Sequence, residues 1–409
     1  KTTYEENKEE QKLIQKLKTK IVDLSQNSML SCLEQSMPTI SSVNQEYKNI
    51  IRCVFASDNN YVPYLAVTIK SLLEHISNEN FYEIYILENG ISLYNQKLIK
   101  NLNLVENVKI EFINVDIYLE ELKQKKFYTA YYLNLSTYFR FFVTKIFKDF
   151  DKILYLDCDI IILEDIANLY NIEMPDDNLL AAVRDYGVIN LLNDKERIDI
   201  YKYENYFQNK LNLAIPTDYF QAGVLVMNLK QLKKLDLINL CFEKTKEIGP
   251  PLFVDQCILN SLFYNKVKLL PMKWNLLSYL LFDDDKMFLP SDIKNEYFEM
   301  IYKQEGIIHF ATFEKPWLCP HLPLAEIWWQ YARLTPFYEE IIYRNAKNWS
   351  NIRYDDRNII ENEKYYRFKY FKYKILSLLS FGKKHAYYKE KLKLYKFNYE
   401  KAQKLKEAV

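Results

Sequence analysis

The sequence has 409 residues, of which 49% are hydrophobic and 27% are charged, and its formal net charge is +1. This balance is typical of a globular protein with a full hydrophobic core, and it excludes a largely disordered chain. The net charge gives no sign of a nucleic-acid partner, and no apolar run approaches the ~20 residues that a transmembrane helix needs.

The chain divides into three segments that differ in composition and in hydrophobic pattern. Residues 1–47 are rich in Lys, Glu and Gln with few apolar positions, and this pattern predicts a helical N-terminal arm that ends in a Ser-rich linker. From 48 to 335, short apolar runs alternate with helical stretches, which predicts an α/β domain with a mostly parallel sheet covered on both faces. Residues 336–409 are basic, aromatic and helical in pattern, and we expect a C-terminal extension there.

Within the α/β segment the elements follow one another along the chain. The apolar runs predict strands over 49–56, 81–87, 108–115, 152–157, 179–185, 220–229 and 306–311. Helical periodicity predicts helices over 61–76, 94–104, 229–246 and 254–264. Pro63 suits the first turn of its helix, because its missing N–H has no partner at that position.

The six cysteines have no paired metal spacing. A chain of this length does not need disulfides for stability, so we expect free thiols in a reducing, cytoplasmic compartment. They are Cys32, Cys53, Cys158, Cys241, Cys257 and Cys319.

An acidic pair, Asp157 and Asp159, directly follows the apolar run 152–156. Ligands of open α/β sheets bind outside the carboxyl ends of strands, and two carboxylates around one turn can converge on a hard divalent cation. A solvated turn with capping aspartates is the alternative. A haloacid-dehalogenase-type phosphatase is another, since it also uses Asp-X-Asp after a strand, and the acidic run 283–285 could imitate its later pair.

His309 follows the apolar run 306–308, and Lys315 follows it in a loop with Pro316 and Trp317. A histidine at a strand end is often a satisfied core residue. With a lysine nearby, it could instead ligate a metal while the lysine binds phosphate. His321 and Cys319 are too few for a tetrahedral zinc site.

Six ordered blocks between about 50 and 335 make the chain similar to glycosyltransferase family 8, the retaining enzymes that include lipopolysaccharide galactosyl- and glucosyltransferases. The blocks are VFASDNNYVPYLAVTIKSL, STYFRFF, KILYLDCDIII, FQAGVLVMNL, DQCILN and HFATFEKPW. The resemblance implies a GT-A fold, a Rossmann-like mixed sheet flanked by helices. It also implies transfer of a hexose from UDP-galactose or UDP-glucose to a cell-surface glycan such as lipooligosaccharide.

The resemblance also implies site residues. Asp157, Asp159 and His309 would ligate Mn²⁺ or Mg²⁺. The donor nucleotide would be bound by Ala56, Asp58, Asn60, Tyr61, Arg140 and Lys315. The catalytic, sugar-facing set would be Asp185, Gln221, Asp255 and Gln256.

Two positions depart from the family pattern: Thr312 stands where a glycine is frequent, and Gln221 where asparagine is common. By the same resemblance Gln256 would lie closest to the reacting carbon. A glutamine is a poor nucleophile compared with a carboxylate, so front-face attack is favoured over a covalent intermediate. A binding module with an inactive sugar-nucleotide pocket is the alternative that Thr312 leaves open.

From Lys364 onward, basic residues outnumber acidic ones and Tyr and Phe are interleaved with them. This pattern favours binding to an anionic membrane surface, with the protein peripheral on the inner face of the plasma membrane. A solvated helical appendage or a dimer contact is the alternative. Single-stranded nucleic acid also binds basic, aromatic surfaces, but nothing upstream supports it.

Overall fold

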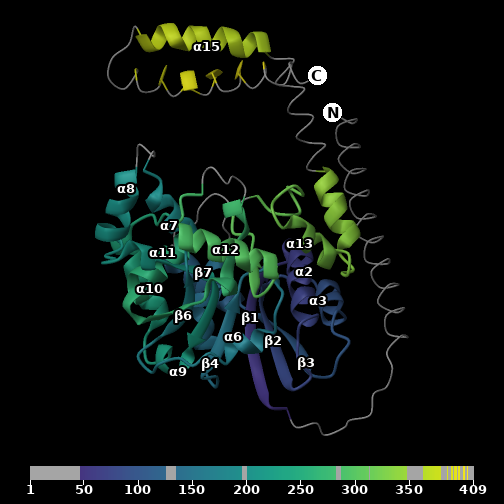
Figure 1. Ribbon diagram of the computed structural model, residues 1–409. Helices are drawn as coiled ribbons and strands as arrows, with labels where there is room; N and C mark the ends of the chain where they lie inside the picture. Colours follow the sequence, from purple (N-terminus) through teal and green to yellow (C-terminus); the bar gives the residue numbers. More distant parts are fainter. Residues whose placement is uncertain are drawn as a thin grey trace, which may run out of the picture. The chain divides into compact units, whose positions relative to one another are not determined.

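The computed structural model describes residues 47–125, 135–195, 200–281, 287–312, 314–347 and 363–378, with scattered positions from 385 to 403. The chain divides into two compact units, 1–337 and 338–409 (Figure 1). The predicted helical arm and Cys32 lie outside the described residues. The five described cysteines are free.

A seven-stranded sheet with the order β3-β2-β1-β4-β7-β6-β8 forms the centre of the first unit. Its strands are β1 (Asn49–Asp58), β2 (Asn80–Asn89), β3 (Val108–Asn114), β4 (Lys152–Leu156), β6 (Leu180–Arg184), β7 (Phe220–Asn228) and β8 (Val267–Leu270). Strand β7 runs antiparallel to both neighbours, and the other four pairings are parallel. The sheet is therefore mixed, as the GT-A resemblance implied.

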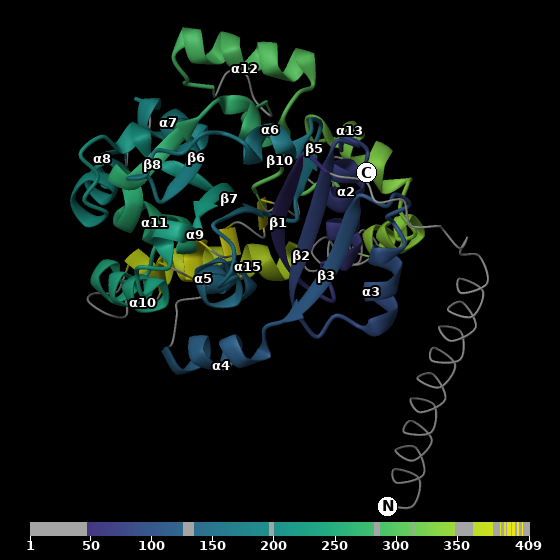
Figure 2. The ribbon, with the colours of Figure 1, turned by 90° about the horizontal axis from the view of Figure 1, so that it is seen from below.

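Helices cover both faces of this sheet (Figure 2). The described α-helices of the first unit are α2 (Val62–Leu73), α3 (Leu93–Lys100), α4 (Asp116–Lys125), α5 (Val143–Ile146), α6 (Ile166–Tyr170), α7 (Tyr186–Asn193), α8 (Ile200–Asn205), α9 (Leu229–Leu232), α10 (Leu237–Ile248), α11 (Val254–Phe263), α12 (Ser291–Lys303) and α13 (Ala325–Ala332). Consecutive residues Cys53, Val54 and Phe55 of β1 are all buried, although their side chains point to opposite faces. The apolar runs are continuous because the sheet has two covered faces.

The single helix predicted over 229–246 is wrong. The chain forms α9, turns, and begins α10 at Leu237. Asp236 caps the new helix, since its carboxylate accepts a hydrogen bond from the N–H of Asn239. This side chain competes with helix continuation and favours a new N-terminus.

A second, small sheet has the order β5-β10-β9 and consists of β5 (Ile160–Ile162), β9 (Leu276–Leu277) and β10 (Ile307–His309). β10 runs antiparallel to β5 and parallel to β9. Gly306 precedes β10 with φ of 77°, and a Cβ there would lie 2.1 Å from the carbonyl oxygen of Lys273. Only glycine allows this close approach.

The second unit contains the helix α15 (Glu363–Leu378) and further helical positions up to 403. Within this unit, tyrosine rings join α15 to the later helical positions. Tyr373 stacks on Tyr395 with ring centroids 5.3 Å apart, and Tyr370 stacks on Tyr399 with centroids 6.0 Å apart. None of the described helices combines the length and apolar character needed to cross a bilayer.

Candidate functional site

A cavity of about 580 Å³ opens at the carboxyl ends of β1 and β4, beside the start of β7. Parallel strands of an open α/β sheet place ligand sites at this edge. All but one of the site residues named from the sequence line it, namely Ala56, Asp58, Tyr61, Arg140, Asp157, Asp159, Asp185, Gln221, Asp255, Gln256, His309 and Lys315. Asn60 is the exception: it is exposed, and its N–H donates to Asp58 Oδ1.

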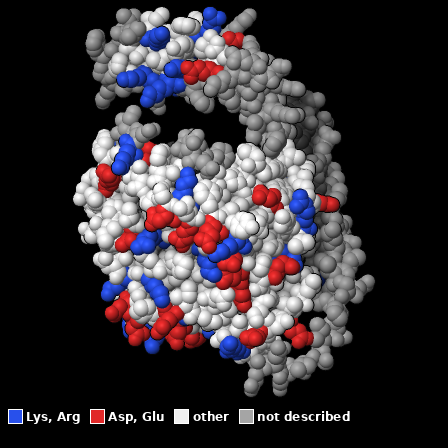
Figure 3. All heavy atoms as spheres, in the orientation of Figure 1, with Lys and Arg blue, Asp and Glu red and all other residues white. Residues whose placement is uncertain are grey.

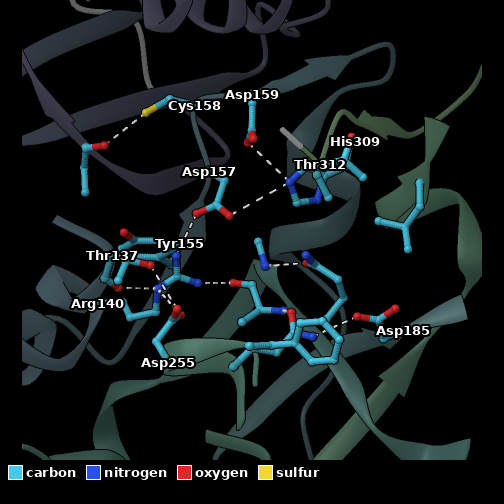
Figure 4. A pocket seen from close by; sticks show the side chains of 18 of the residues that line it. Thr137, Arg140, Tyr155, Asp157, Cys158, Asp159, Asp185, Asp255, His309 and Thr312 are labelled. Atoms are coloured by element: carbon cyan, nitrogen blue, oxygen red, sulfur yellow. Dashed lines mark hydrogen bonds and ion pairs between the residues drawn. The ribbon is translucent and has the colours of Figure 1, made fainter. Parts of the chain in front are cut away.

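The small sheet brings His309 to the acidic pair. The antiparallel register of β5 and β10 sets His309 opposite Ile160, and the N–H of Phe310 donates to the carbonyl of Asp159 at 3.0 Å. His309 Nε2 lies 3.2 Å from Asp159 Oδ1 and 4.0 Å from Asp157 Oδ2 (Figure 4). The ligand atoms of these three side chains all lie within 4.8 Å of one another.

The donor set fits a divalent cation. Carboxylate oxygens suit Mg²⁺ and Mn²⁺, and imidazole is the commonest nitrogen ligand of metals in proteins. His309 Nδ1 lies 2.9 Å from Asn275 Oδ1, and a hydrogen bond on one ring nitrogen is the usual companion of metal ligation through the other. Five aspartates line the cavity against two basic side chains, so the site carries an excess of negative charge that a cation would balance.

Lys315 and Asp159 form an ion pair inside this cluster, and Lys315 Nζ also donates to the carbonyl of Phe310. Burial acts to raise the pKa of Asp159, but Lys315 and His309 outweigh burial and the net pKa is lowered. The carboxylate is therefore held ionised at neutral pH, which is the state that binds a cation.

Arg140 is fully engaged by the protein. Its guanidinium is 2.8 Å from Asp157 Oδ1 and 3.0 Å from Asp255 Oδ2, and it also donates to the carbonyl of Ala222. The side chain is 4% exposed and lies over the ring of Tyr155 at 4.4 Å. Arg140 thus holds the carboxylates of Asp157 and Asp255 in place.

Asp255 and Gln256 enter from the first turn of α11, and Asp185 enters as the N-cap of α7. Gln256 Nε2 donates to Asp185 Oδ2 at 2.8 Å, and Gln256 Oε1 accepts the N–H of Ala222 at 2.9 Å. Burial raises the pKa of both Asp185 and Asp255, with Gln256 and Arg140 respectively opposing the rise. The two hydrogen bonds of Gln256 fix both the nitrogen and the oxygen of its side-chain amide.

Tyr61 forms one wall near the start of α2. Its ring lies edge-on to Trp317 with centroids 5.7 Å apart, and Trp317 stacks on Tyr64 at 4.0 Å. Trp317 follows Lys315 in the same loop, so the aromatic wall and the lysine are positioned together. Thr312 also lines the cavity, and its hydroxyl donates to the carbonyl of Glu314.

Several residues of the site were not predicted. Thr137, Tyr155 and Tyr279 line the cavity, and Asn275 bonds His309 from behind. Thr137 and Tyr155 fall inside two of the quoted blocks but were assigned no role, whereas Asn275 and Tyr279 lie on short 3₁₀ segments outside every block. Gly223 lies inside the block FQAGVLVMNL, and a Cβ there would lie 2.3 Å from His309 Cε1 and 2.8 Å from Asp157 Oδ2.

This mixed sheet and its strand-end cavity define an α/β protein with the GT-A architecture of glycosyltransferases. The model of Glycosyl transferase family 8 matches residues 52–319, and the chain belongs to this family. The phosphatase alternative is therefore not favoured, and the acidic run 283–285 on which it depended lies outside the described residues.

The chain is also similar to several named proteins, two of which are named as glycosyltransferases. The chain is 26% identical to General stress protein A of Bacillus subtilis over 66% of this chain and 87% of that one. It is 28% identical to Glycosyltransferase GlyF of Streptococcus pneumoniae over 75% and 65% of the two chains. It is 26% identical to Lipopolysaccharide 1,2-glucosyltransferase of Escherichia coli over 73% and 78%.

Solved structures agree on the fold. The apo structure of the bifunctional glycosyltransferase WbbM has a TM-score of 0.60 and 25% identity, and covers 76% of this chain but 54% of its own length. The galactosyltransferase LgtC, in complex with donor and acceptor sugar analogs, has a TM-score of 0.55 and 23% identity over 70% of this chain and 96% of its own.

Proposed function

We propose that the chain is a metal-dependent, retaining hexosyltransferase that moves galactose or glucose from a UDP-sugar to a cell-surface glycan. The observation that carries this proposal is the convergence of Asp157, Asp159 and His309 beside Lys315 in one cavity. A cation site with a lysine ammonium group beside it suits a pyrophosphate group better than it suits a neutral ligand.

Asp157, Asp159 and His309 would hold Mn²⁺ or Mg²⁺. When bound, such an ion supplies a Lewis acid for the departing diphosphate. Lys315 already reaches the same cluster through Asp159, so its ammonium group can transfer part of its bonding to a phosphate oxygen. The positive charge needed as the sugar–phosphate bond breaks is thus concentrated on one side of the cavity.

The uridine would bind where Ala56, Asp58 and Tyr61 form the wall next to β1. The Tyr61 ring offers a flat face for the base, and Trp317 fixes that ring from its edge. Asn60 lies outside the lining, so its contact would occur at the rim of the cavity.

The donor sugar would lie against the remaining polar group, which is Asp185, Gln221, Asp255 and Gln256. Gln256 Oε1 accepts the N–H of Ala222, so the oxygen is not free to attack a sugar carbon. This supports front-face attack by the acceptor hydroxyl rather than a covalent intermediate on this side chain. Asp255, bonded to Arg140 and Thr137, is likewise occupied.

The acceptor we propose is a lipooligosaccharide or a related cell-surface glycan, because one relative is named as a lipopolysaccharide glucosyltransferase. The chemistry of α15 supports an acceptor anchored in lipid. Phe368, Phe371 and Ile375 are 65%, 48% and 57% exposed and form one stripe at helical spacing. The described Lys and Arg side chains of the second unit outnumber acidic ones on the face that Figure 3 shows.

An apolar, aromatic stripe beside basic residues fits the headgroup region of an anionic bilayer. We therefore propose peripheral attachment to the inner face of the cytoplasmic membrane through 364–409. Vesicles with and without phosphatidylserine test it: removal of the chain from Lys364 onward should abolish sedimentation with anionic vesicles and spare donor hydrolysis. Sedimentation of the shortened chain would contradict the assignment.

A donor panel tests the central proposal. The protein is incubated with Mn²⁺ and each of several UDP-sugars without acceptor, and released UDP is measured. Slow hydrolysis of UDP-galactose or UDP-glucose is expected, and it should stop when the metal is chelated. Calorimetric binding of UDP without hydrolysis of any donor would instead indicate the inactive binding module, and release of phosphate from phosphomonoesters would indicate a phosphatase.

A further inference from the structure

The start of β7 has backbone groups outside the sheet ladder. Pairing of β7 with β4 begins at Val224, and a bulge between Ala182 and Arg184 interrupts its pairing with β6. Side chains satisfy the N–H groups left over: that of Ala222 donates to Gln256, and that of Gly223 donates to Gln221 Oε1. Buried backbone groups must find partners, and here the partners are two glutamines.

The Gly223 contact fixes the orientation of a chain of amides. A backbone N–H can only donate, so the Gln221 atom that faces it is the carbonyl oxygen. The same oxygen lies 2.7 Å from an atom of Asn275, and that atom must be the amide nitrogen, which donates. Asn275 therefore turns its oxygen to His309 Nδ1 at 2.9 Å. Only a protonated Nδ1 can complete this chain, and in the neutral imidazole Nε2 then keeps its lone pair.

This chain of hydrogen bonds, which we call the amide relay, favours a proton on Nδ1 of His309. The two aspartates on the other side of the ring favour a proton on Nε2. His309 Nε2 faces Asp157 and Asp159, and a proton on Nε2 would donate to Asp159 Oδ1 across 3.2 Å. That tautomer would have no lone pair for a cation. Asn275 and His309 are each 1% exposed, so bulk solvent does not provide an alternative partner for Nδ1.

We propose that Asn275 is a positioning residue that keeps the proton of His309 on Nδ1 and so reserves Nε2 for a divalent cation. The geometry shows three supporting contacts in series, Gly223 to Gln221 to Asn275 to His309, which end on the ring nitrogen of His309 that faces away from the two carboxylates. The inference rests on the proposed metal site, and it adds a residue that sits behind the cavity and meets no substrate.

The test compares Asn275→Leu, which keeps the size and removes both hydrogen bonds, with Asn275→Asp, which keeps an oxygen on Nδ1. Affinity for Mn²⁺ alone, measured by calorimetry, should fall 10–100-fold in Asn275→Leu and stay within about threefold of the wild type in Asn275→Asp. Asn107→Leu is the matched control, because Asn107 is a buried asparagine that bonds Ser77 and Asn80 away from the site. It should lower the melting temperature without changing Mn²⁺ affinity.

The tautomer is a second, independent readout. The chain has four histidines, so ¹⁵N-histidine spectra with Mg²⁺ are simple, and His309→Gln identifies the signal of His309. A proton on Nδ1 is expected in the wild type. A proton on Nε2, or a folded Asn275→Leu variant that binds Mn²⁺ like the wild type, would overturn the proposal.

The results that would refute the proposed transferase function differ from those that would refute the role of Asn275. A wild type that binds Mn²⁺ but hydrolyses no UDP-sugar defeats the transferase assignment, while the affinity series still decides the role of Asn275. A wild type that binds no metal leaves the metal-free spectrum to decide: Nδ1–H supports the relay and Nε2–H refutes it.

Discussion

The two sheets of the first unit contribute to the site in different ways. The seven-stranded sheet is buried on both faces and supplies Asp157 and Gln221 from its strand ends. The small sheet has strands of three, three and two residues, yet it alone sets His309 opposite the acidic pair. We infer that the large sheet contributes most of the folding stability, whereas the register of the small sheet positions the side chains of the proposed cation site.

Polar contacts join the small sheet to helix α2, which packs beside the large sheet. The hydroxyl of Thr68 on α2 bonds the carbonyls of Cys158 and Ile160, and the hydroxyl of Ser71 accepts the N–H of Ile162. Hydrogen bonds depend on direction more than apolar packing does. Substitutions at the small sheet should therefore reduce turnover more than stability, and substitutions in the flanks of the large sheet should do the reverse.

The largest effect is expected for Asp159→Ala. Loss of this carboxylate removes a cation ligand and the partner of Lys315, so we expect metal-dependent donor binding to disappear and kcat/KM to fall about 1000-fold or more. Asp165→Ala is the control: Asp165 caps α6 and bonds Tyr82, so its loss should cost about 1–3 kcal/mol of stability and leave kcat/KM unchanged. Unchanged donor affinity in Asp159→Ala, measured by calorimetry with Mn²⁺, would refute the ligand assignment.

Gly223→Ala should come next. The added Cβ would overlap His309 and Asp157, and a shift of about 1 Å in such a site can cost 100-fold in rate. We expect kcat and Mn²⁺ affinity to fall together, because the methyl group pushes apart the two sides of the cation site. A variant with normal Mn²⁺ affinity and normal kcat would show that the two sheets are not held as closely as the structure has them.

The same contrast explains what the sequence could predict. Strands β1, β4 and β7 were predicted because sheets covered on both faces require continuous apolar runs. The meeting of Asp157, Asp159 and His309 was also expected, on the basis of the family resemblance. Strand β9 was not, because two residues give no periodicity.

Other features depend on long-range partners that local sequence does not encode. Asn275 and Tyr279 belong to short 3₁₀ segments whose places are fixed by tertiary contacts. The helix break at Asp236 is different, because its cap on Asn239 is a local contact that the apolar periodicity concealed. The ion pairs of Arg140 with Asp157 and Asp255 could not be predicted either, because these three residues are far apart in the sequence.

A smaller effect is expected for Thr68→Val, which keeps the shape but removes the hydroxyl between α2 and the Asp-X-Asp turn. We expect a loss of about 1–2 kcal/mol of stability and a roughly tenfold lower kcat, since the turn loses its fixed position. Thr245→Val removes a comparable buried bond within α10, from Thr245 to the carbonyl of Cys241. Equal kcat in the two variants, after correction for the folded fraction, would contradict the division of roles.

The smallest effect, and the sharpest test of the link between the sheets, is expected for Gln221→Asn. Gln221 belongs to β7 of the large sheet but bonds Asn275, which precedes β9 of the small one. An amide one methylene shorter cannot span both Gly223 and Asn275, so the face it turns to the sugar should change while the cation ligands remain. We expect the ratio of kcat/KM for UDP-glucose and UDP-galactose to change by a few-fold, with Mn²⁺ affinity lowered less than in Asn275→Leu. Because the side chain reaches both sheets, a variant with an unchanged ratio would place the donor sugar elsewhere in the cavity, and one without any activity would make Gln221 part of the reaction itself.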